Sequence, residues 1–416
     1  MPDLRARRDY QIAEIVMAGV AMFVLKEGSR NAYNNDRSDG NFRENYQRMF
    51  GLRLPHMDTV DTVFRMLEEE HLQELRREMI RLLLKKKVLH TYKIPGLGFN
   101  VSIDATGVAS YSYRHCEDCL KCTSATGKTT YFHSVLEAKL ITSNGLALSM
   151  DSEWIENGQE GQYDKQDCEM KAFVRLAAKL KKHFPRLPMF ITADGLYPNK
   201  TFFDICRANQ WNYVVTFQDG NLSSVWEEIR LLPVHQSKQT KHVEPHKRGF
   251  TERLLKWEND ICYKSHRLNY IECNEETVYT HSQATEKKRF VHLTNLEISN
   301  TSAPTISMQG RMRWKIENEG FKAQKREGFE LKHKYSRVSP QAMKNYYQTL
   351  QIAHILVQLT IATQAVGEIL AKPGHPSIKD IWKKLLAFML ENLIGLDERN
   401  CLQQKRRQIR LRKRMT

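Results

Sequence analysis

The sequence contains no apolar run as long as the ~20 residues that a membrane-spanning helix requires. Its longest run, from Ile15 to Leu25, follows several arginines, as the apolar part of a secretory leader does. However, Lys26 and Glu27 stand where a leader has its small-residue cleavage site. We therefore expect a buried helix in this segment and no membrane partner.

Cysteine is scarce as well, with 8 residues in a chain of 416. A secreted disulfide framework usually spreads its cysteines over a much shorter chain. Three of these cysteines are close together, at Cys116, Cys119 and Cys122, which favours intracellular thiols or a metal site.

The chain is longer than one compact core usually allows, so we expect roughly two to four folding units.

Acidic residues are outnumbered by basic ones. Asp and Glu total 48 against 64 for Lys and Arg, which gives a net charge of +16. Such an excess is typical of proteins that bind a polyanion, and nucleic acid is the expected partner. With 41% hydrophobic residues, the chain also has enough apolar material for ordinary cores, which excludes a disordered protein.

Hydrophobic periodicity changes several times along the chain. It is helical up to Pro95, then shows short β-type runs with helices between them, then becomes β-like, and finally returns to helical near Met308. We expect a helical, DNA-binding N-terminal region, a split catalytic domain, a β-rich insertion and a helical C-terminal region with a basic tail. The predicted bounds are 1–97, 98–217 with 306–340, 218–305 and 341–416.

Three acidic residues stand out by their context. Asp104 and Asp194 each follow an apolar β-type segment and precede a glycine, whereas Glu317 belongs to a basic helix farther along. Carboxylates at strand ends lie where open α/β sheets bind ligands. Hard oxygen donors from separate elements can hold the two divalent cations that phosphodiester cleavage commonly uses. Either aspartate alone is also compatible with an ordinary turn, so the inference depends on all three together.

The residues around these acids carry a resemblance to a known family. The segments are Ser102-Ile-Asp104-Ala-Thr-Gly107, Thr192-Ala-Asp194-Gly-Leu-Tyr197 and Arg313-Trp-Lys-Ile-Glu317. In order and spacing they resemble the DDE transposases of bacterial insertion sequences, in the branch where a β-rich domain interrupts the catalytic fold. The resemblance covers about residues 98–335. It implies an α/β fold with a ribonuclease H-like mixed sheet, a β-rich insertion and helical N- and C-terminal regions.

The resemblance also implies a function. Asp104, Asp194 and Glu317 would hold two Mg²⁺ or Mn²⁺ ions, water would cleave the DNA at the element's end, and the freed 3′-hydroxyl would attack target DNA. The implied partners are double-stranded DNA, as terminal inverted repeats and target, and a second copy of the chain in a homodimer. The implied location is the cytoplasm, in association with the bacterial nucleoid.

The family signature on the last helix, Tyr-x2-Arg-x3-Glu-x6-Lys, is matched only in part. Arg313 and Glu317 are in register, but Gly310 replaces the tyrosine and Gln324 stands at the lysine position. Lys325 follows one residue later, a step that turns a helical side chain by about 100°. Lys325 can therefore contact phosphate only if the helix bends or ends nearby. Glu319 is the alternative to Glu317, although it breaks the arginine spacing.

Other residues are candidates for supporting roles. The DNA-binding candidates are Arg313, Lys322, Lys325, Lys247 and Arg248. Cys116, Cys119, Cys122 and His133, in a motif that begins with His115, form either a structural zinc site or a group of free thiols. Cys122 also occupies the first glycine position of the phosphate-loop pattern that ends at Gly127-Lys128-Thr129, which argues against a nucleotide cofactor.

Two further questions stay open at the level of sequence. Asp151, Glu153 and Glu156 can supply an extra metal ligand or can pair with neighbouring lysines. The function itself has two alternatives, a transposase-derived DNA-binding protein without catalysis and a ribonuclease H-like nuclease that cuts without joining.

Overall fold

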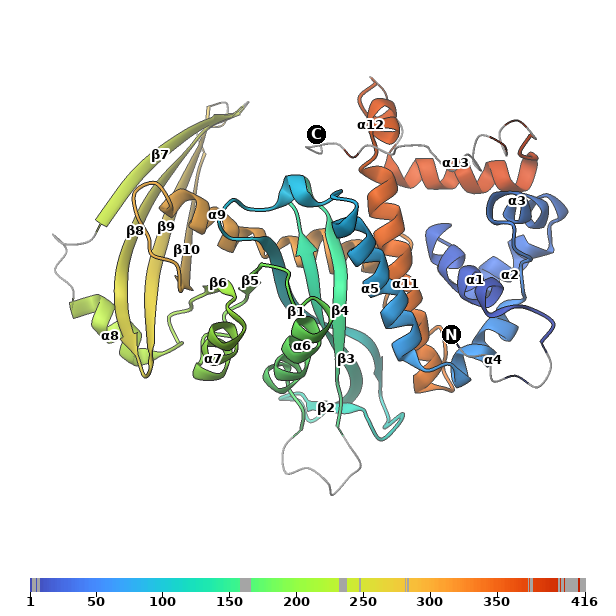
Figure 1. The fold of residues 1–416 in the computed structure, drawn as a ribbon, viewed down its shortest axis with the longest axis horizontal. Coiled ribbons are helices and arrows are strands. Elements are labelled where there is room, and N and C mark those ends of the chain that lie inside the picture. Colours follow the sequence, from blue (N-terminus) through green and yellow to red (C-terminus); the bar gives the residue numbers. More distant parts are fainter. Residues whose placement is uncertain are drawn as a thin grey trace.

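A mixed sheet runs through the part of the chain that carries the three acids (Figure 1). The computed structural model describes residues 1, 5, 8–157, 166–231, 238–246, 248–280, 282, 284–372, 374, 377–395, 397, 400 and 411. In these residues the sheet has ten strands in the order β2-β3-β1-β5-β6-β10-β9-β8-β7, and β4 also pairs with β3. The basic tail expected at residues 405–414 lies outside the described residues, except for residue 411.

Five strands form the central part of the sheet. They are β1 (Phe99–Tyr111), β3 (Thr129–Ile141), β4 (Ala147–Ile155), β5 (Met189–Ala193) and β6 (Asn212–Thr216). The first three are antiparallel, whereas β5 and β6 run parallel to β1 across the helices α6 (Glu169–His183) and α7 (Lys200–Asn209). This order and pairing is that of a ribonuclease H-like sheet, so the predicted mixed α/β fold class is confirmed.

Alternation along β1 assigns its side chains to the two faces of the sheet. Val101 and Ile103 belong to the same apolar core as Phe173 of α6, so this face is covered by helices. Ser102 points to the opposite face, where its hydroxyl lies 2.6 Å from the hydroxyl of Thr192 on β5. The second face of the central strands is therefore polar near their carboxyl ends.

The β-rich stretch continues the same sheet. After α8 (Ser223–Leu231) it contains β7 (Lys238–His246), β8 (Gly249–Tyr263), β9 (His266–Tyr279) and β10 (Thr285–Thr294). β10 pairs antiparallel with β6, with Thr294 opposite Val214. Trp257 of β8 is 1% exposed and packs in a small core beside β6. Because β6 and β10 are hydrogen-bonded neighbours, the position of the stretch is fixed relative to the central strands.

Helices from the two ends of the chain pack together beside the sheet. From the N-terminal side come α1 (Ile12–Val24), α2 (Arg30–Ser38), α3 (Gly40–Phe50), α4 (Met57–Met66), α5 (Glu69–Lys85) and the short 3₁₀ turn η1 (His90–Tyr92). From the other side come α11 (Pro340–Ile361), α12 (Gln364–Leu370) and α13 (Ile378–Glu391). In Figure 1, α11 stands between α5 and α1, and it contacts α1, α4, α5 and β4. The central strands and the N-terminal helices are thus joined through α11.

The predicted buried helix at Ile15–Leu25 is confirmed. It corresponds to α1, whose residues Ile15, Ala18 and Met22 are fully buried in the core shared with α11. Among the residues that the structure describes, none of the helices is long and apolar enough to span a membrane.

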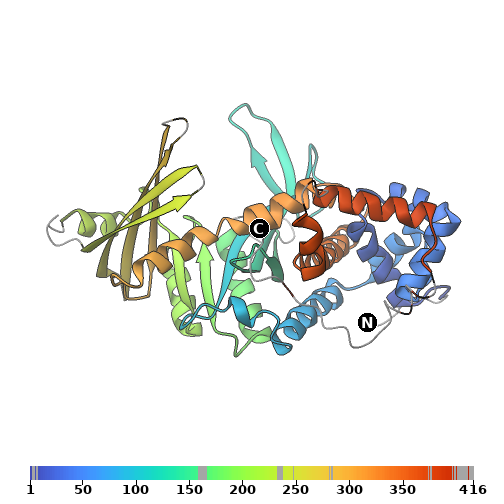
Figure 2. The same cartoon turned by 90° about the horizontal axis from the view of Figure 1, so that it is seen from above.

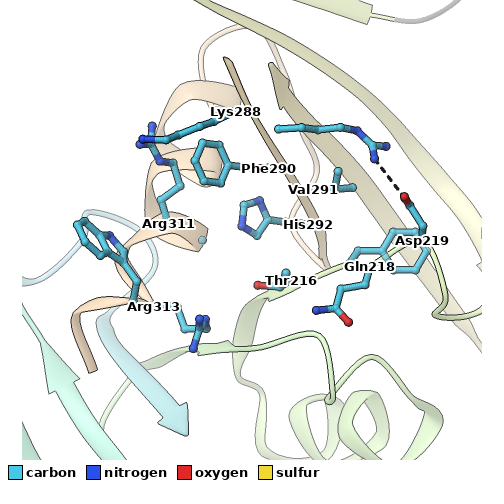
Figure 3. A pocket seen from close by; sticks show the side chains of 13 residues that line it. Thr216, Gln218, Asp219, Lys288, Phe290, Val291, His292, Arg311 and Arg313 are labelled. Carbon is cyan, nitrogen blue, oxygen red and sulfur yellow. Dashed lines mark hydrogen bonds and ion pairs between the residues drawn. The ribbon is translucent and has the colours of Figure 1, made fainter. Parts of the chain in front are cut away.

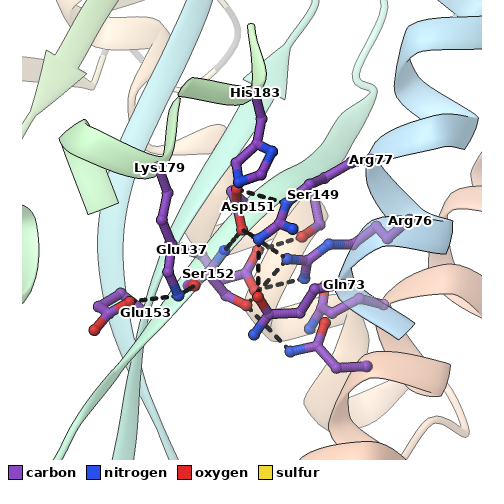
Figure 4. Close-up of polar contacts among 12 residues, drawn as sticks. Gln73, Arg76, Arg77, Glu137, Ser149, Asp151, Ser152, Glu153, Lys179 and His183 are labelled. Carbon is purple, nitrogen blue, oxygen red and sulfur yellow. Dashed lines mark hydrogen bonds and ion pairs between the residues drawn. The ribbon is translucent and has the colours of Figure 1, made fainter. Parts of the chain in front are cut away.

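A buried network of charged residues connects α5 to the sheet (Figure 4). Arg77 Nε lies 2.8 Å from Asp151 Oδ2, and Arg76 Nη1 lies 3.6 Å from Glu137 Oε1. All four side chains are fully buried. Glu137 also accepts a 2.6 Å hydrogen bond from the hydroxyl of Tyr347 on α11. Since buried charges are tolerated only when paired, this network fixes how the helices sit on β3 and β4.

The other two acids of the 151–156 cluster are paired as well. Glu153 forms ion pairs with Arg175 and Lys179 of α6, and Glu156 forms one with Lys344 of α11. Together with Asp151 they hold neighbouring helices against β4. The geometry thus favours ion pairing over an extra metal ligand, and the partners include arginines besides the expected lysines.

Asp151→Asn is expected to lower the free energy of unfolding by about 3–5 kcal/mol, because it leaves the buried guanidinium of Arg77 without its main counter-charge. Urea denaturation of the full chain measures the change. The control is Lys200→Ala, which removes an exposed ion pair with Asp204 and should cost about 0–1 kcal/mol. Equal effects of the two substitutions would contradict the role given to the network.

Candidate active site

The two predicted aspartates lie on neighbouring parallel strands. β1 and β5 pair as far as Ser102 opposite Thr192, so Asp104 and Asp194 each stand two residues beyond this last pair. Asp194 directly follows β5, as predicted. The prediction that a strand ends at Asp104 is wrong, because β1 continues to Tyr111 on its pairing with β3. The parallel pairing nevertheless stops before Asp104, which opens the sheet beside it.

Glu317 is brought to this position by the segment after the β-rich stretch. α9 (Ala303–Met312) crosses β5 and β6 and leads into a π-helical turn, η2 (Ile316–Lys322), which contacts β1. Between these two helices, Arg313 connects two of the acids: its Nη1 lies 3.5 Å from Asp104 Oδ2 and its Nη2 lies 2.8 Å from Glu317 Oε1. The guanidinium therefore joins the helix to the strand.

Glu319, the alternative to Glu317, is engaged elsewhere. Its Oε1 lies 3.2 Å from the Lys315 ammonium one turn earlier. In addition, the side chain of Gln358 on α11 donates a 3.0 Å hydrogen bond to the Glu319 carbonyl. The geometry thus favours Glu317 over Glu319 as the acid that faces Asp104.

The other two acids contribute to a raised pKa of Asp104. Burial, together with the charges of Glu317 and Asp194, raises its pKa from 3.8 to about 7, although Arg313 opposes the rise. Asp104 therefore experiences the charges of both other acids. A group of carboxylates in this state is ready to bind a cation, because a cation would relieve both the desolvation and the repulsion.

Glu169 is a fourth acid at the site, and the sequence analysis missed it. It lies in the first turn of α6, and its pKa is raised by burial and by the charge of Asp194. Its Oε2 accepts a 3.5 Å hydrogen bond from the hydroxyl of the buried Tyr197. An acid in the first turn of a helix ordinarily serves the helix dipole, so its sequence context carried no sign of this position.

The π-helical turn η2 accounts for the lysine that lies one residue after the family's lysine position on the last helix. A π turn closes its hydrogen bonds over five residues where an α turn closes them over four, so η2 takes up one additional residue after Glu317. In α10 (Ala323–Arg326), which follows, Gln324 is fully buried and hydrogen-bonds to Gln351 of α11. Lys325 is only half-buried, and burial and the charge of Lys332 lower its pKa, while the charges of Asp104 and Glu317 oppose that lowering. Lys325 therefore lies on the side of the acids, one residue after the family position.

The tyrosine of the family signature has no room in this chain. A Cβ atom at Gly310 would lie 2.6 Å from the ring of His292 on β10 and 2.8 Å from Val214 on β6. Glycine is thus required for α9 to pack closely on these strands. Beside it, a cavity of about 600 Å³ is lined by Arg311, Arg313 and strand residues (Figure 3). Arg313 lines this cavity and also contacts two of the acids, so the cavity adjoins the site.

The remaining DNA-binding candidates are spread over the molecule. Lys322 is exposed at the end of η2. Arg248 is exposed in the turn between β7 and β8, near the far edge of the sheet, and Lys247 lies outside the described residues. The structure therefore brings Arg313 and Lys325 to the acids but does not bring Arg248 there.

The four predicted zinc ligands do not all come together. The side chains of Cys116, Cys119 and His133 meet, whereas Cys122 is exposed on β2 (Leu120–Thr123). Cys122 pairs with Thr130 of β3, so the two share a face. His133 is three residues farther along β3 and points to the other face. Cys122 is therefore excluded from the cluster by strand alternation.

Comparisons with known proteins add a distant structural likeness. No family model matches the chain, and no curated protein matches it. Among solved structures, it is similar to the piggyBac transposase in a synaptic complex with hairpin DNA, at 13% identity and a TM-score of 0.41. The match covers 96% of this chain and 78% of that chain. The chemistry of the site therefore has to follow from its own side chains.

The pKa of Asp104 predicts how stability depends on pH without metal. Between its ordinary pKa of 3.8 and its folded pKa of about 7, the folded protein holds a proton that the unfolded chain releases, so stability falls as pH rises. In chelator, Asp104→Asn is expected to be more stable than the wild type near pH ~8, by up to a few kcal/mol. The difference should shrink toward pH ~5.

Thermal unfolding over this pH range measures the effect. Asp204→Asn is a control of opposite sign, because its hydrogen bond from Lys200 holds the pKa of Asp204 below its ordinary value. That variant should be less stable than the wild type by an amount that stays constant over this pH range, because Asp204 is ionised throughout it in both the folded and the unfolded chain. If Asp104→Asn and the wild type keep the same stability difference at every pH, Asp104 is not the repelled acid described above.

Proposed function

We propose that this chain is a DDE-type DNA transposase of a bacterial insertion sequence. It cleaves DNA at the ends of its element and joins the resulting 3′-hydroxyl to target DNA. The observation that carries the proposal is the bridge made by Arg313 between Asp104 and Glu317, with Asp194 at the matching position of the next strand. A group of three acids beside a cavity lined by Arg311 and Arg313 suits catalysis on a phosphodiester better than binding alone.

The donor set fits Mg²⁺ or Mn²⁺. Asp104, Asp194 and Glu317 offer only carboxylate oxygens, which these hard cations prefer. The raised pKa of Asp104 supports this assignment, because Arg313 offsets the negative charge of the acids only in part. A bound cation would supply the rest of the counter-charge. When bound, a pair of such ions supplies positive charge to the attacking and leaving oxygens of the phosphodiester.

The protein's own cations complete the site. Arg313 orients two of the acids and is close enough to contact the scissile phosphate, and Lys325 adds a second positive charge on the same side. In the proposed complex, the DNA backbone lies over the polar face of the central strands, beside these cations. In this arrangement the acids carry the reaction, and the cations position the DNA.

The wider partners follow from the same proposal. The net charge of +16 suits double-stranded DNA, both as terminal inverted repeats and as target. Because two element ends have to be held together, the chain acts as a homodimer, in the bacterial cytoplasm at the nucleoid.

Asp104→Asn, Asp194→Asn and Glu317→Gln are each expected to reduce cleavage and joining of element-end DNA by about 1,000-fold or more, since each removes several kcal/mol of transition-state stabilisation. DNA binding should persist. Glu319→Gln is the matched control on the same helix and should keep most of the activity. Strand-transfer assays with Mg²⁺ and the element's own ends measure both steps.

The same assays distinguish the alternatives. Cleavage without joining by the wild type would favour a ribonuclease H-like nuclease. Binding without any cleavage would favour a DNA-binding protein derived from a transposase. Activity that survives in the aspartate variants would contradict the proposed site.

Lys325→Ala is expected to weaken DNA binding and to reduce the slope of log K against log salt by about 1, as the loss of one phosphate contact does. Gln324→Ala is the control, because that neighbour is buried against α11. It should lower the stability of the fold and leave the salt slope unchanged. Fluorescence anisotropy at several salt concentrations measures both slopes, and the opposite pattern would contradict the effect assigned to the π turn.

A further inference from the structure

A compact group of sulfur and nitrogen atoms lies at the base of the β2–β3 hairpin, which projects from the body of the molecule (Figure 2). The Sγ atoms of Cys116 and Cys119 are 3.4 Å apart, and each lies 3.4 Å from Nε2 of His133. His133 and Cys119 are buried. The separation of the sulfurs is far longer than the ~2.05 Å of a disulfide, so the cysteines are free thiols.

These separations are close to the edges of a tetrahedral zinc site. With Zn–S near 2.3 Å and Zn–N near 2.0–2.1 Å, tetrahedral angles put neighbouring ligand atoms roughly 3.5–3.8 Å apart. The observed triangle has three edges of 3.4 Å. A cation of this size can therefore be accommodated with a small expansion of the group.

His115 supplies the fourth ligand. One ligand atom from each of His115, Cys116 and His133 falls within a group less than 4.8 Å across. Nε2 of His115 lies 2.8 Å from the carbonyl oxygen of Arg337, so it carries the proton and donates it there. The Nδ1 atom then carries a free lone pair. This atom is buried without a hydrogen-bond partner among the residues that the structure describes. A hydrogen bond from the second nitrogen is the usual way in which proteins orient a metal-binding histidine.

The surroundings hold the His115 ring in place. It stacks on Tyr111 at the end of β1, with the ring centroids 4.2 Å apart and the planes at 13°. The ammonium of Lys334 also lies over the Tyr111 ring, 4.2 Å from the ring centroid. Lys334 and Arg337 belong to the segment that follows the glutamate-bearing helix. The cluster thus meets that segment, the end of β1 and the start of β3.

We propose that His115, Cys116, Cys119 and His133 form a structural Zn²⁺ site. Two thiolates and two imidazoles in tetrahedral positions are ligands that select zinc among the common cellular divalent metals. All four positions are filled by protein, which leaves no open position for substrate and makes the site structural. The ion anchors the projecting hairpin and the segment after the glutamate-bearing helix to the same point. This inference does not depend on the proposed function.

Metal analysis of the full chain, purified without chelator, tests the site. The wild type is expected to contain about one zinc per chain. Cys119→Ser should lose the ion, and His115→Ala should bind it much more weakly. Cys122→Ser is the matched control, because Cys122 lies three residues after Cys119 on the opposite face of the hairpin. This variant should keep the full zinc content.

Cobalt substitution of the wild type gives a second readout that does not rely on variants that fold poorly. Apo protein titrated with Co²⁺ should develop the visible absorption of a tetrahedral site together with thiolate-to-cobalt charge transfer, and Zn²⁺ should displace both. Chelation should also lower the melting temperature and expose residues 112–130 to protease. Zinc that is lost in Cys122→Ser and retained in His115→Ala would overturn the ligand assignment. A wild type that binds neither metal would overturn the site.

Discussion

The parallel pairing between β1 and β5 is the constraint on which the candidate active site depends. It places Asp104 and Asp194 at the same height on adjacent strands, and its end at Ser102 and Thr192 leaves the sheet open where they stand. Without this register the two carboxylates would point to opposite faces, since a one-residue slip inverts every side chain of a strand. The acids are therefore positioned by backbone hydrogen bonds rather than by their own contacts.

The position of the third acid depends on longer-range packing. α9 lies close to β6 and β10 only because Gly310 has no side chain, and the guanidinium of Arg313 then reaches both Asp104 and Glu317. Burial and the charges of Glu317 and Asp194 raise the pKa of Asp104 despite this bridge. The site is thus held in an electrostatically unfavourable state by the surrounding fold. Such a state is typical of functional sites that await a ligand or cation.

Rigidity of the surrounding fold comes from α11 and the buried charges beside it. Arg76 and Arg77 of α5, Glu137 and Asp151 of the sheet and Tyr347 of α11 form one connected group. Because breaking any one pair leaves an uncompensated charge, the group restricts sliding of the helices on the strands. α11 also contacts the glutamate-bearing segment, through Gln324 and Glu319. The N-terminal helices and the active-site segment are therefore mechanically linked.

Much of this protein could be predicted from local sequence patterns. Apolar segments of strand length ending near Asp104 and Asp194, helical periodicity at both ends and the spacing of Arg313 and Glu317 are properties of short segments, and they gave the fold class and the candidate acids. The paired state of Asp151 could not be chosen from them, because ion pairing and metal binding use the same residue type.

Only the tertiary structure decided which face of a helix or strand each residue occupies and which distant segments come into contact. The π turn restored Lys325 to the side of the acids, although an α-helical count directs Gln324 there. Strand alternation removed Cys122 from the thiol cluster, whereas His115 lies close to Cys116 and His133. Glu169 joined the acids only because the first turn of α6 lies near Asp194 and Tyr197. Sequence determines which chemical groups are present, whereas hydrogen-bond register and helix phase determine which of them meet.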